Sequence, residues 1–138
     1  APNVNPNKIA AIGYCFGGST ALQLAYTGEK LDAVATFHAA LPAPSAEEAK
    51  QIKARILVCH GADDSFIPPA AVNSFKKALD EATVVNQIVQ YPGAVHSFTV
   101  PDADKHNIPG MKYNKTADEE SWKQMAQLFN EMLQTPAK

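Results

Sequence analysis

The chain has 138 residues, of which 46% are hydrophobic and 19% charged, and its formal net charge is −2. This composition predicts a single globular domain, 1–138, that is large enough to bury a core. The small charge gives no electrostatic reason to expect nucleic acid or an anionic membrane as a partner, and no apolar stretch approaches the ~20 residues of a membrane span.

The first part of the chain alternates apolar runs with amphipathic segments. Residues 8–14 (KIAAIGY) and 33–39 (AVATFHA) are apolar runs of strand length. Between them, residues 19–28 place apolar side chains on one helical face and end at a glycine. Residues 42–52 predict a loop and then a short helix, with a Ser-x-x-Glu capping box that begins at Ser45.

The second part continues the alternation. Residues 55–61 (RILVCHG) predict a buried strand, and 69–82 predict a helix with proline in its first turn. Residues 86–92 alternate apolar and polar side chains, which favours a strand at the sheet edge. Residues 92–114 predict a long irregular loop, and 116–134 predict the last helix. That helix carries a stripe that we expect in the core: Trp122, Met125, Phe129, Met132 and Leu133.

Apolar strands that alternate with amphipathic helices are typical of the α/β class. We expect a three-layer sandwich, in which a parallel sheet of about four strands has helices on both faces. In such sheets, functional side chains gather at the carboxyl ends of the strands. Cys15 follows the first strand, Asp63 and Asp64 follow the third, and His96 follows the fourth.

Cys15 lies in the sequence G-Y-C-F-G, after a strand and at the start of a helix. This is the context of a nucleophile elbow, with cysteine in the place of serine. We expect a strained turn in which Gly13 and Gly17 come too close to their neighbours for a Cβ atom. The helix start favours the thiolate, and the backbone N–H of Phe16 would be one oxyanion donor.

A cysteine nucleophile needs a base, and the base needs an acid to orient it. The spacing G-x-x-D-x-x-[VI]-P selects Asp64 over Asp63 as the acid. Only His96 follows the last strand, in the chain order nucleophile, acid, histidine. Of the other histidines, His38 and His60 lie near strand ends, where backbone contacts could satisfy their hydrogen bonds. His106 lies in the long loop.

The segments GYCFGG, HGADDSFIP, GAVHSF and YNKTADEESWKQMAQLFNEML resemble the carboxyl-terminal part of the dienelactone hydrolase family, within the α/β-hydrolases. The resemblance places the family's catalytic cysteine, aspartate and histidine on Cys15, Asp64 and His96. It implies a small-molecule ester or lactone as substrate, a thioester intermediate and no cofactor. Strands before the elbow in this family supply a second oxyanion donor and a glutamate that contacts the resting cysteine.

Around the thiol, we expect Tyr14, Phe16 and Phe98 to line the substrate cleft, with ordinary packing as the alternative. No metal site is predicted, because His60, Asp63 and Asp64 are near one another but lack a second pair of ligands. The two cysteines of the chain predict free thiols and a cytoplasmic protein.

The chain starts at Ala1, and few residues precede its first strand. Four strands added in one direction would leave that strand at an open sheet edge. We therefore expect either a fragment of a longer hydrolase, whose amino-terminal half covers this strand, or a homodimer in which a second copy covers it. The alternative to an enzyme is a catalytically silent fragment or interaction module that retains the triad.

Overall fold

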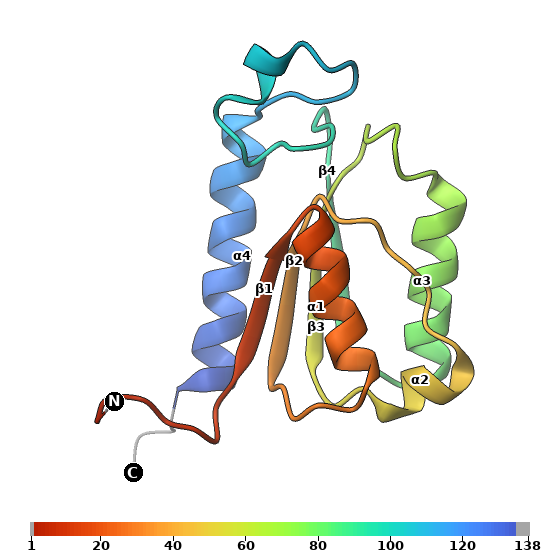
Figure 1. The fold of residues 1–138 in the computed structure, drawn as a ribbon, viewed down its shortest axis with the longest axis vertical. Helices are drawn as coiled ribbons and strands as arrows, with labels where there is room; N and C mark the ends of the chain where they lie inside the picture. Colours follow the sequence, from red (N-terminus) through yellow and green to blue (C-terminus); the bar gives the residue numbers. More distant parts are fainter. Residues whose placement is uncertain (1, 135–138) are drawn as a thin grey trace.

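The computed structural model describes residues 2–134 and is built on a four-stranded parallel sheet (Figure 1). Its strands are β1 (Ala10–Tyr14), β2 (Ala33–Phe37), β3 (Arg55–Gly61) and β4 (Asn86–Tyr91). They lie in the order β1-β2-β3-β4, and every neighbouring pair is parallel. The strand order therefore has no reversal, as the sequence predicted.

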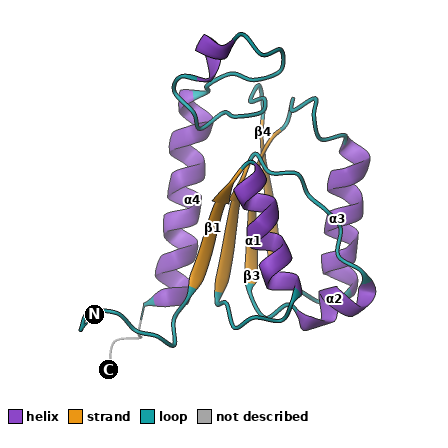
Figure 2. Ribbon diagram, in the orientation of Figure 1, coloured by secondary structure: helices purple, strands orange, loops and turns teal. Residues whose placement is uncertain are grey.

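Helices cover both faces of the sheet, as Figure 2 shows. The helices are α1 (Phe16–Tyr26), α2 (Ala46–Gln51), α3 (Pro69–Glu81) and α4 (Lys115–Leu133). Helices α1 and α3 pack on one face, α2 contacts both of them, and α4 packs alone on the other face (Figure 1). The three-layer α/β class is confirmed. No helix within residues 2–134 is long and apolar enough to cross a membrane.

Strand β2 shows why the sheet needs two helical layers. All five of its residues are buried. Val34 packs with α1 and α3, whereas Ala33, Ala35 and Phe37 pack with α4. Because successive side chains of a strand point to opposite faces, a continuous apolar run requires cover on both sides.

The two edge strands differ in how they meet solvent. Strand β4 lies at the edge, as expected, and all of its residues but Tyr91 are at least partly exposed, without a strict alternation. Strand β1 is apolar, yet Ile12 is 42% exposed and Tyr14 is 40% exposed. Helix α4 packs over β2 and β3, and on that face of β1 only Ala10 packs against the core cluster that includes α4 residues, so that Ile12 and Tyr14 stay exposed.

The predicted core stripe of α4 is wrong at Trp122, which is 56% exposed. The buried side of the helix runs instead through Ala117, Ser121, Met125 and Leu128. These residues follow one another at spacings of three and four, so they lie on one face of the helix, and Trp122 falls beside that face.

The connecting segments agree with the local signals in the sequence. Helix α2 begins with the expected capping box, in which the Ser45 side chain accepts from the N–H of Glu48 and the Glu48 side chain accepts from the N–H of Ser45. The long loop contains a short 3-10 turn (Ala103–His106).

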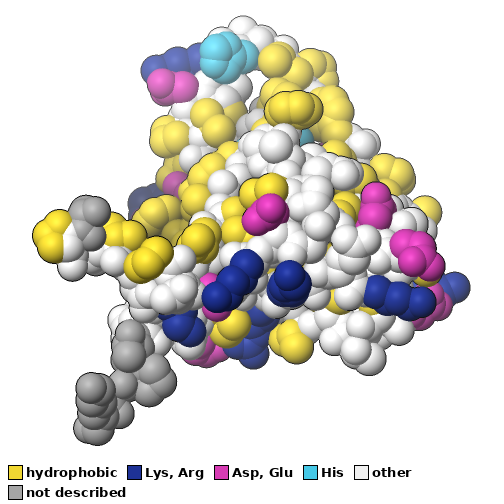
Figure 3. All heavy atoms as spheres, turned by 60° about the horizontal axis from the view of Figure 1, so that its bottom comes forward, with side chains coloured by type: hydrophobic (Ala, Val, Ile, Leu, Met, Phe, Trp, Pro, Cys, Tyr) yellow, Lys and Arg dark blue, Asp and Glu magenta, His cyan; other side chains and the backbone are white. Residues whose placement is uncertain are grey.

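At the amino ends of the strands, Lys and Arg side chains are interspersed with Asp and Glu, without a large patch of one sign (Figure 3).

Candidate active site

Cys15 lies on the sharp turn between β1 and α1. Its backbone has φ 52° and ψ −122°, a conformation that is strained for a residue with a side chain. A Cβ atom on Gly13 would lie 2.2 Å from the carbonyl oxygen of Gly17, so this close approach requires glycine. The expectation for Gly17 was wrong, because a Cβ there meets nothing within 4 Å; the second crowded position is Gly18, against Ala39.

The amino end of α1 is open toward the turn. Cys15 is the N-cap residue, and its side chain caps no backbone N–H. Its carbonyl oxygen accepts from the N–H groups of Gly18 and Ser19. The N–H of Phe16 comes first in the helix and has no intrahelical acceptor. It is therefore available to a negative oxygen that develops beside the sulfur.

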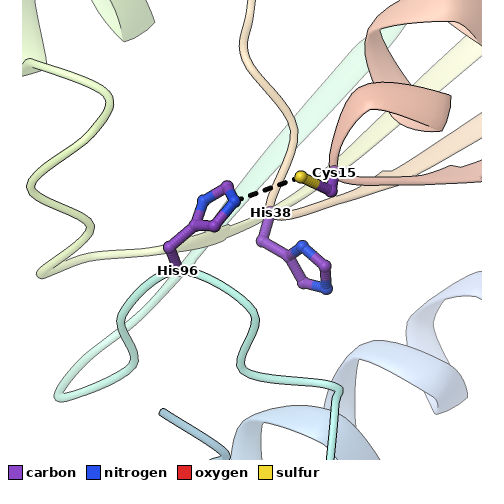
Figure 4. Close-up of side chains that lie close together, drawn as sticks. All are labelled: Cys15, His38 and His96. Atoms are coloured by element: carbon purple, nitrogen blue, oxygen red, sulfur yellow. Dashed lines mark hydrogen bonds between the residues drawn. The ribbon is translucent and has the colours of Figure 1, made fainter. Parts of the chain in front are cut away.

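Three residues from three separate loops meet at the carboxyl edge of the sheet. Cys15 Sγ lies 3.2 Å from His96 Nε2 (Figure 4), and His96 Nδ1 lies 2.9 Å from Asp64 Oδ2. The other carboxylate oxygen of Asp64 accepts from the N–H of Phe66 at 2.9 Å. Asp64 is buried and Asp63 is exposed. The structure thus brings together the cysteine, histidine and aspartate selected from the sequence.

The hydrogen bonds among Cys15, His96 and Asp64 shift the pKa values of the histidine and the aspartate. Burial would raise the pKa of Asp64, but the hydrogen bonds from His96 and the Phe66 N–H, with the charges of nearby histidines, hold it below its ordinary value. The hydrogen bond to Asp64 raises the pKa of His96, against the effect of burial, and the contact with Cys15 adds to the rise. An ionised Asp64 accepts only, so His96 Nδ1 carries a proton and Nε2 faces the thiol.

His38 is a further residue at the thiol, which the sequence did not select. The register of the sheet pairs Tyr14 with Phe37, so the residues that follow them lie side by side. The ring is 1% exposed, and its Nε2 lies 2.8 Å from the hydroxyl of Thr99. Its partner is thus a side chain, not the expected backbone. Burial and the neighbouring His96 lower the pKa of His38 to about 4.

A hollow of about 310 Å³ opens over the thiol, lined by Cys15, His96 and five further residues: Phe16, Ser19, Ala40, Phe66 and Ile67. Phe16 is 81% exposed and Phe66 is 50% exposed, so two aromatic side chains flank the hollow. No local pattern in the sequence marks Phe66 as a lining residue, although it lies in the segment that follows β3.

Of the three predicted lining residues, Phe16 lines the hollow and the other two lie elsewhere. Phe98 is fully buried in the core on the α4 side of the sheet, where its ring meets His38 edge-on. Its position corresponds to the packing alternative. Tyr14 stacks on Phe37 at a centroid distance of 4.6 Å and does not line the hollow.

Two other features of the molecule resemble binding sites. A larger hollow of about 570 Å³ lies between α4 and the β3–β4 side of the sheet, but none of the three triad residues lines it. Within residues 2–134, the cluster of three side chains that could hold a metal is Cys15, His38 and His96, not the group His60, Asp63 and Asp64.

The chain matches the model of the "Dienelactone hydrolase family" over residues 1–133. The chain belongs to this family. A Synechocystis sp. relative, provisionally named a carboxymethylenebutenolidase, is 32% identical over 93% of this chain and 52% of its own length. A Caenorhabditis elegans relative, K02A2.1, is 27% identical over 94% of this chain and 84% of its own length.

A solved structure shows the same arrangement of elements. The "Dienelactone Hydrolase-like Promiscuous Phospotriesterase P91" from metagenomic libraries is 43% identical and has a TM-score of 0.92, over 96% of this chain and 56% of that chain. This dienelactone hydrolase family member therefore spans about half the length of the Synechocystis relative and of this solved structure.

Proposed function

We propose that this chain carries the nucleophile, base and acid of a hydrolase that cleaves ester or lactone bonds through a thioester. The observation that carries the proposal is the continuous row from Cys15 Sγ through His96 to Asp64, with spacings of 3.2 and 2.9 Å, on a strained turn at a helix start. Family membership supports the reaction class.

In the first half-reaction, His96 Nε2 takes the proton of Cys15, and the thiolate attacks the carbonyl carbon. The electron pair of the carbonyl moves onto its oxygen, which the N–H of Phe16 stabilises. When the tetrahedral intermediate collapses, the carbon–oxygen bond of the ester breaks. His96 returns its proton to the leaving alkoxide, and the acyl group stays on the sulfur. Asp64 stabilises the imidazolium form of His96 throughout.

In the second half-reaction, His96 takes a proton from water, and the hydroxide attacks the thioester carbon. The carbon–sulfur bond then breaks, and the thiolate recovers its proton from His96. The products are a carboxylic acid and the free thiol, so atoms and charge balance without a cofactor.

The hollow favours small substrates with an apolar group beside the scissile bond. Phe16 and Phe66 offer aromatic surface beside the thiol. The similarity to a protein described as a promiscuous phosphotriesterase makes a phosphotriester a second substrate class to test, since a thiolate can also attack phosphorus. An activated aryl acetate and an aryl dialkyl phosphate are therefore the paired probes.

The decisive experiment compares the native chain with Cys15→Ala in the hydrolysis of p-nitrophenyl acetate. We expect the alanine variant to lose turnover by at least ~10³-fold, because the nucleophile is gone. Unchanged turnover in Cys15→Ala would contradict the proposal. Cys59, the buried free cysteine, provides the matched control: iodoacetamide should label Cys15 and leave Cys59 untouched in the folded protein. A silent module would show no turnover in either chain.

We further propose that chain outside this sequence, or a second copy of it, covers the edge of β1. The exposure of Ile12 and Tyr14 supports this, and so does the half-length match to relatives. Light scattering and hydrogen exchange test it. A sharp monomer peak with strong exchange protection of β1 would contradict it.

A further inference from the structure

Three side chains around the thiol converge in a way that the hydrolytic reaction does not require. The sulfur of Cys15 and one ring nitrogen from each of His38 and His96 lie within 4.8 Å of one another. Figure 4 shows the two rings on the same side of the turn, both close to the sulfur. The triad uses only one of these histidines.

The second nitrogen of each ring is already held by a neighbour. His96 Nδ1 lies 2.9 Å from Asp64, and His38 Nε2 lies 2.8 Å from the hydroxyl of Thr99. Each contact fixes the orientation of its ring. The other nitrogen of His96 faces the thiol at 3.2 Å. Histidines that bind metals in proteins are usually held in this way, with the second N–H donated to a carboxylate or another oxygen.

His38 supplies a second, independent observation that points to a ligand beside the thiol. Its Nδ1 is buried and has no hydrogen-bond partner among residues 2–134. The backbone of His38 has φ 39°, an uncommon conformation for a residue other than glycine. Leaving a buried ring nitrogen without a partner costs free energy. A ligand that accepts the lone pair of Nδ1 would remove that cost.

We propose that Cys15, His38 and His96 bind one Zn²⁺ ion and that this ion reversibly masks the nucleophile. Zinc favours thiolate and imidazole ligands and commonly takes three protein ligands with a water in the fourth position. Zn–S bonds of about 2.3 Å and Zn–N bonds of about 2.0 Å at tetrahedral angles separate sulfur from nitrogen by about 3.5 Å. Cys15 Sγ and His96 Nε2 are 3.2 Å apart, and all three ligand atoms lie within 4.8 Å of one another. The side chains would therefore have to close in by at most about 1.3 Å to reach zinc geometry.

Zinc binding fixes the protonation of the ligands. Imidazole binds the ion in its neutral form and cysteine binds it as the thiolate. Binding replaces the Sγ–H bond by a Zn–S bond and releases that proton to solvent, and no group is oxidised or reduced. His96 Nε2 becomes a ligand and can no longer act as a base. Nucleophile and base are thus occupied together, which stops the reaction proposed above.

Co²⁺ is a suitable probe of the site, because a bound thiolate gives it a charge-transfer absorption band. We expect the native chain at pH 7.5 to bind one equivalent of Co²⁺ with that band, and Zn²⁺ to displace the cobalt. Zn²⁺ should also abolish hydrolysis of p-nitrophenyl acetate, and a chelator should restore it. Cys15→Ser should lose the band.

Variants of the histidines separate this site from binding elsewhere. We expect His38→Asn, which keeps a residue type tolerated at positive φ, to bind Co²⁺ at least ~10-fold more weakly. Thr99→Val, which removes the contact that orients His38, should weaken binding by ~10–100-fold. His60→Asn is the matched control. His60 is also buried with an unpartnered Nδ1, but it lies outside the cluster. The Co²⁺ affinity of this variant should equal that of the native chain.

The site proposal fails if the folded native chain gives no thiolate band, or if His38→Asn and Thr99→Val bind as tightly as His60→Asn. Circular dichroism identifies a variant that does not fold, and the remaining variants then carry the test. The masking rests on the proposed function, but the cobalt band does not. A band without ester hydrolysis contradicts only the hydrolase, and hydrolysis without a band contradicts only the metal site.

Discussion

The two sides of β1 are built very differently. On one side, β1 pairs with β2, and the loops after β1, β3 and β4 bring Cys15, Asp64 and His96 into a hydrogen-bonded row. On the other side, the edge of β1 has no neighbouring strand within residues 2–134, and Ile12 and Tyr14 are exposed. Cys15, Asp64 and His96 therefore all come from the side of β1 that faces β2, and none comes from the exposed side.

The largest effect is expected on the side of β1 that faces β2, where Cys15, Asp64 and His96 meet. His96→Gln removes the base while it leaves Cys15 in place, and we expect turnover of p-nitrophenyl acetate to fall by ~10³–10⁴-fold. The rate of Cys15 alkylation by iodoacetamide should fall as well, because the imidazole no longer takes the thiol proton. His106→Gln, a change in the distant 3-10 turn, is the control. Equal turnover in the two variants would remove His96 from the mechanism.

The turn itself can be tested with a pair of glycines. Gly13→Ala puts a Cβ 2.2 Å from the Gly17 carbonyl oxygen, so we expect a loss of about 3 kcal/mol or more in the free energy of unfolding. Gly17→Ala enters open space in α1, so it should be neutral or stabilise the protein by up to about 1 kcal/mol. Urea unfolding measures both, and similar losses would show that the turn is not held by this contact.

The buried histidine beside the thiol gives a pH dependence of stability. The pKa of His38 falls from 6.5 to about 4 in the folded state, so the unfolded chain binds more protons between these values. Stability should therefore decrease as the pH falls from 6.5 toward 4, by at most about 3 kcal/mol from this group. His38→Asn should flatten the profile in urea unfolding. A profile as steep as that of the native chain would assign the dependence to other groups.

The pH dependence of turnover should come from His96, whose pKa is raised and not lowered. His96 must be neutral to act as a base, and its pKa is raised, chiefly by the hydrogen bond to Asp64. Turnover should therefore rise with pH through a midpoint above 6.5. In Asp64→Asn, whose amide gives no negative charge, this midpoint should move down. An unmoved midpoint would show that another group controls the rate.

The smallest effect is expected on the open side. Ile12 is 42% exposed, so Ile12→Gln should change the free energy of unfolding of the isolated chain by only about 0.5 kcal/mol. The same change should weaken any association through the β1 edge, which light scattering at increasing concentration would detect. Val34→Ala on the buried strand β2 is the contrast, with an expected loss of about 1–3 kcal/mol.

Much of the fold was predictable because its signals are local. Apolar runs and amphipathic periods lie within single elements, so they predicted the α/β class, the parallel sheet and the capping box at Ser45. The residues of the candidate site were predictable for a related reason. Each lies directly after a strand, and the carboxyl ends of parallel strands must meet at one edge.

Which side chains meet across elements depends on the packing of the whole chain and cannot be read from local patterns. The register that pairs Tyr14 with Phe37 sets His38 beside Cys15. The placement of α4 over β2 and β3 leaves Trp122 exposed, and Phe98 turns into the core behind His38. These outcomes depend on register and on helix rotation, which residues far apart in the chain fix together. The local pattern around IGYCFGG determines the strained turn, whereas its neighbours in space determine what chemistry the thiol can share.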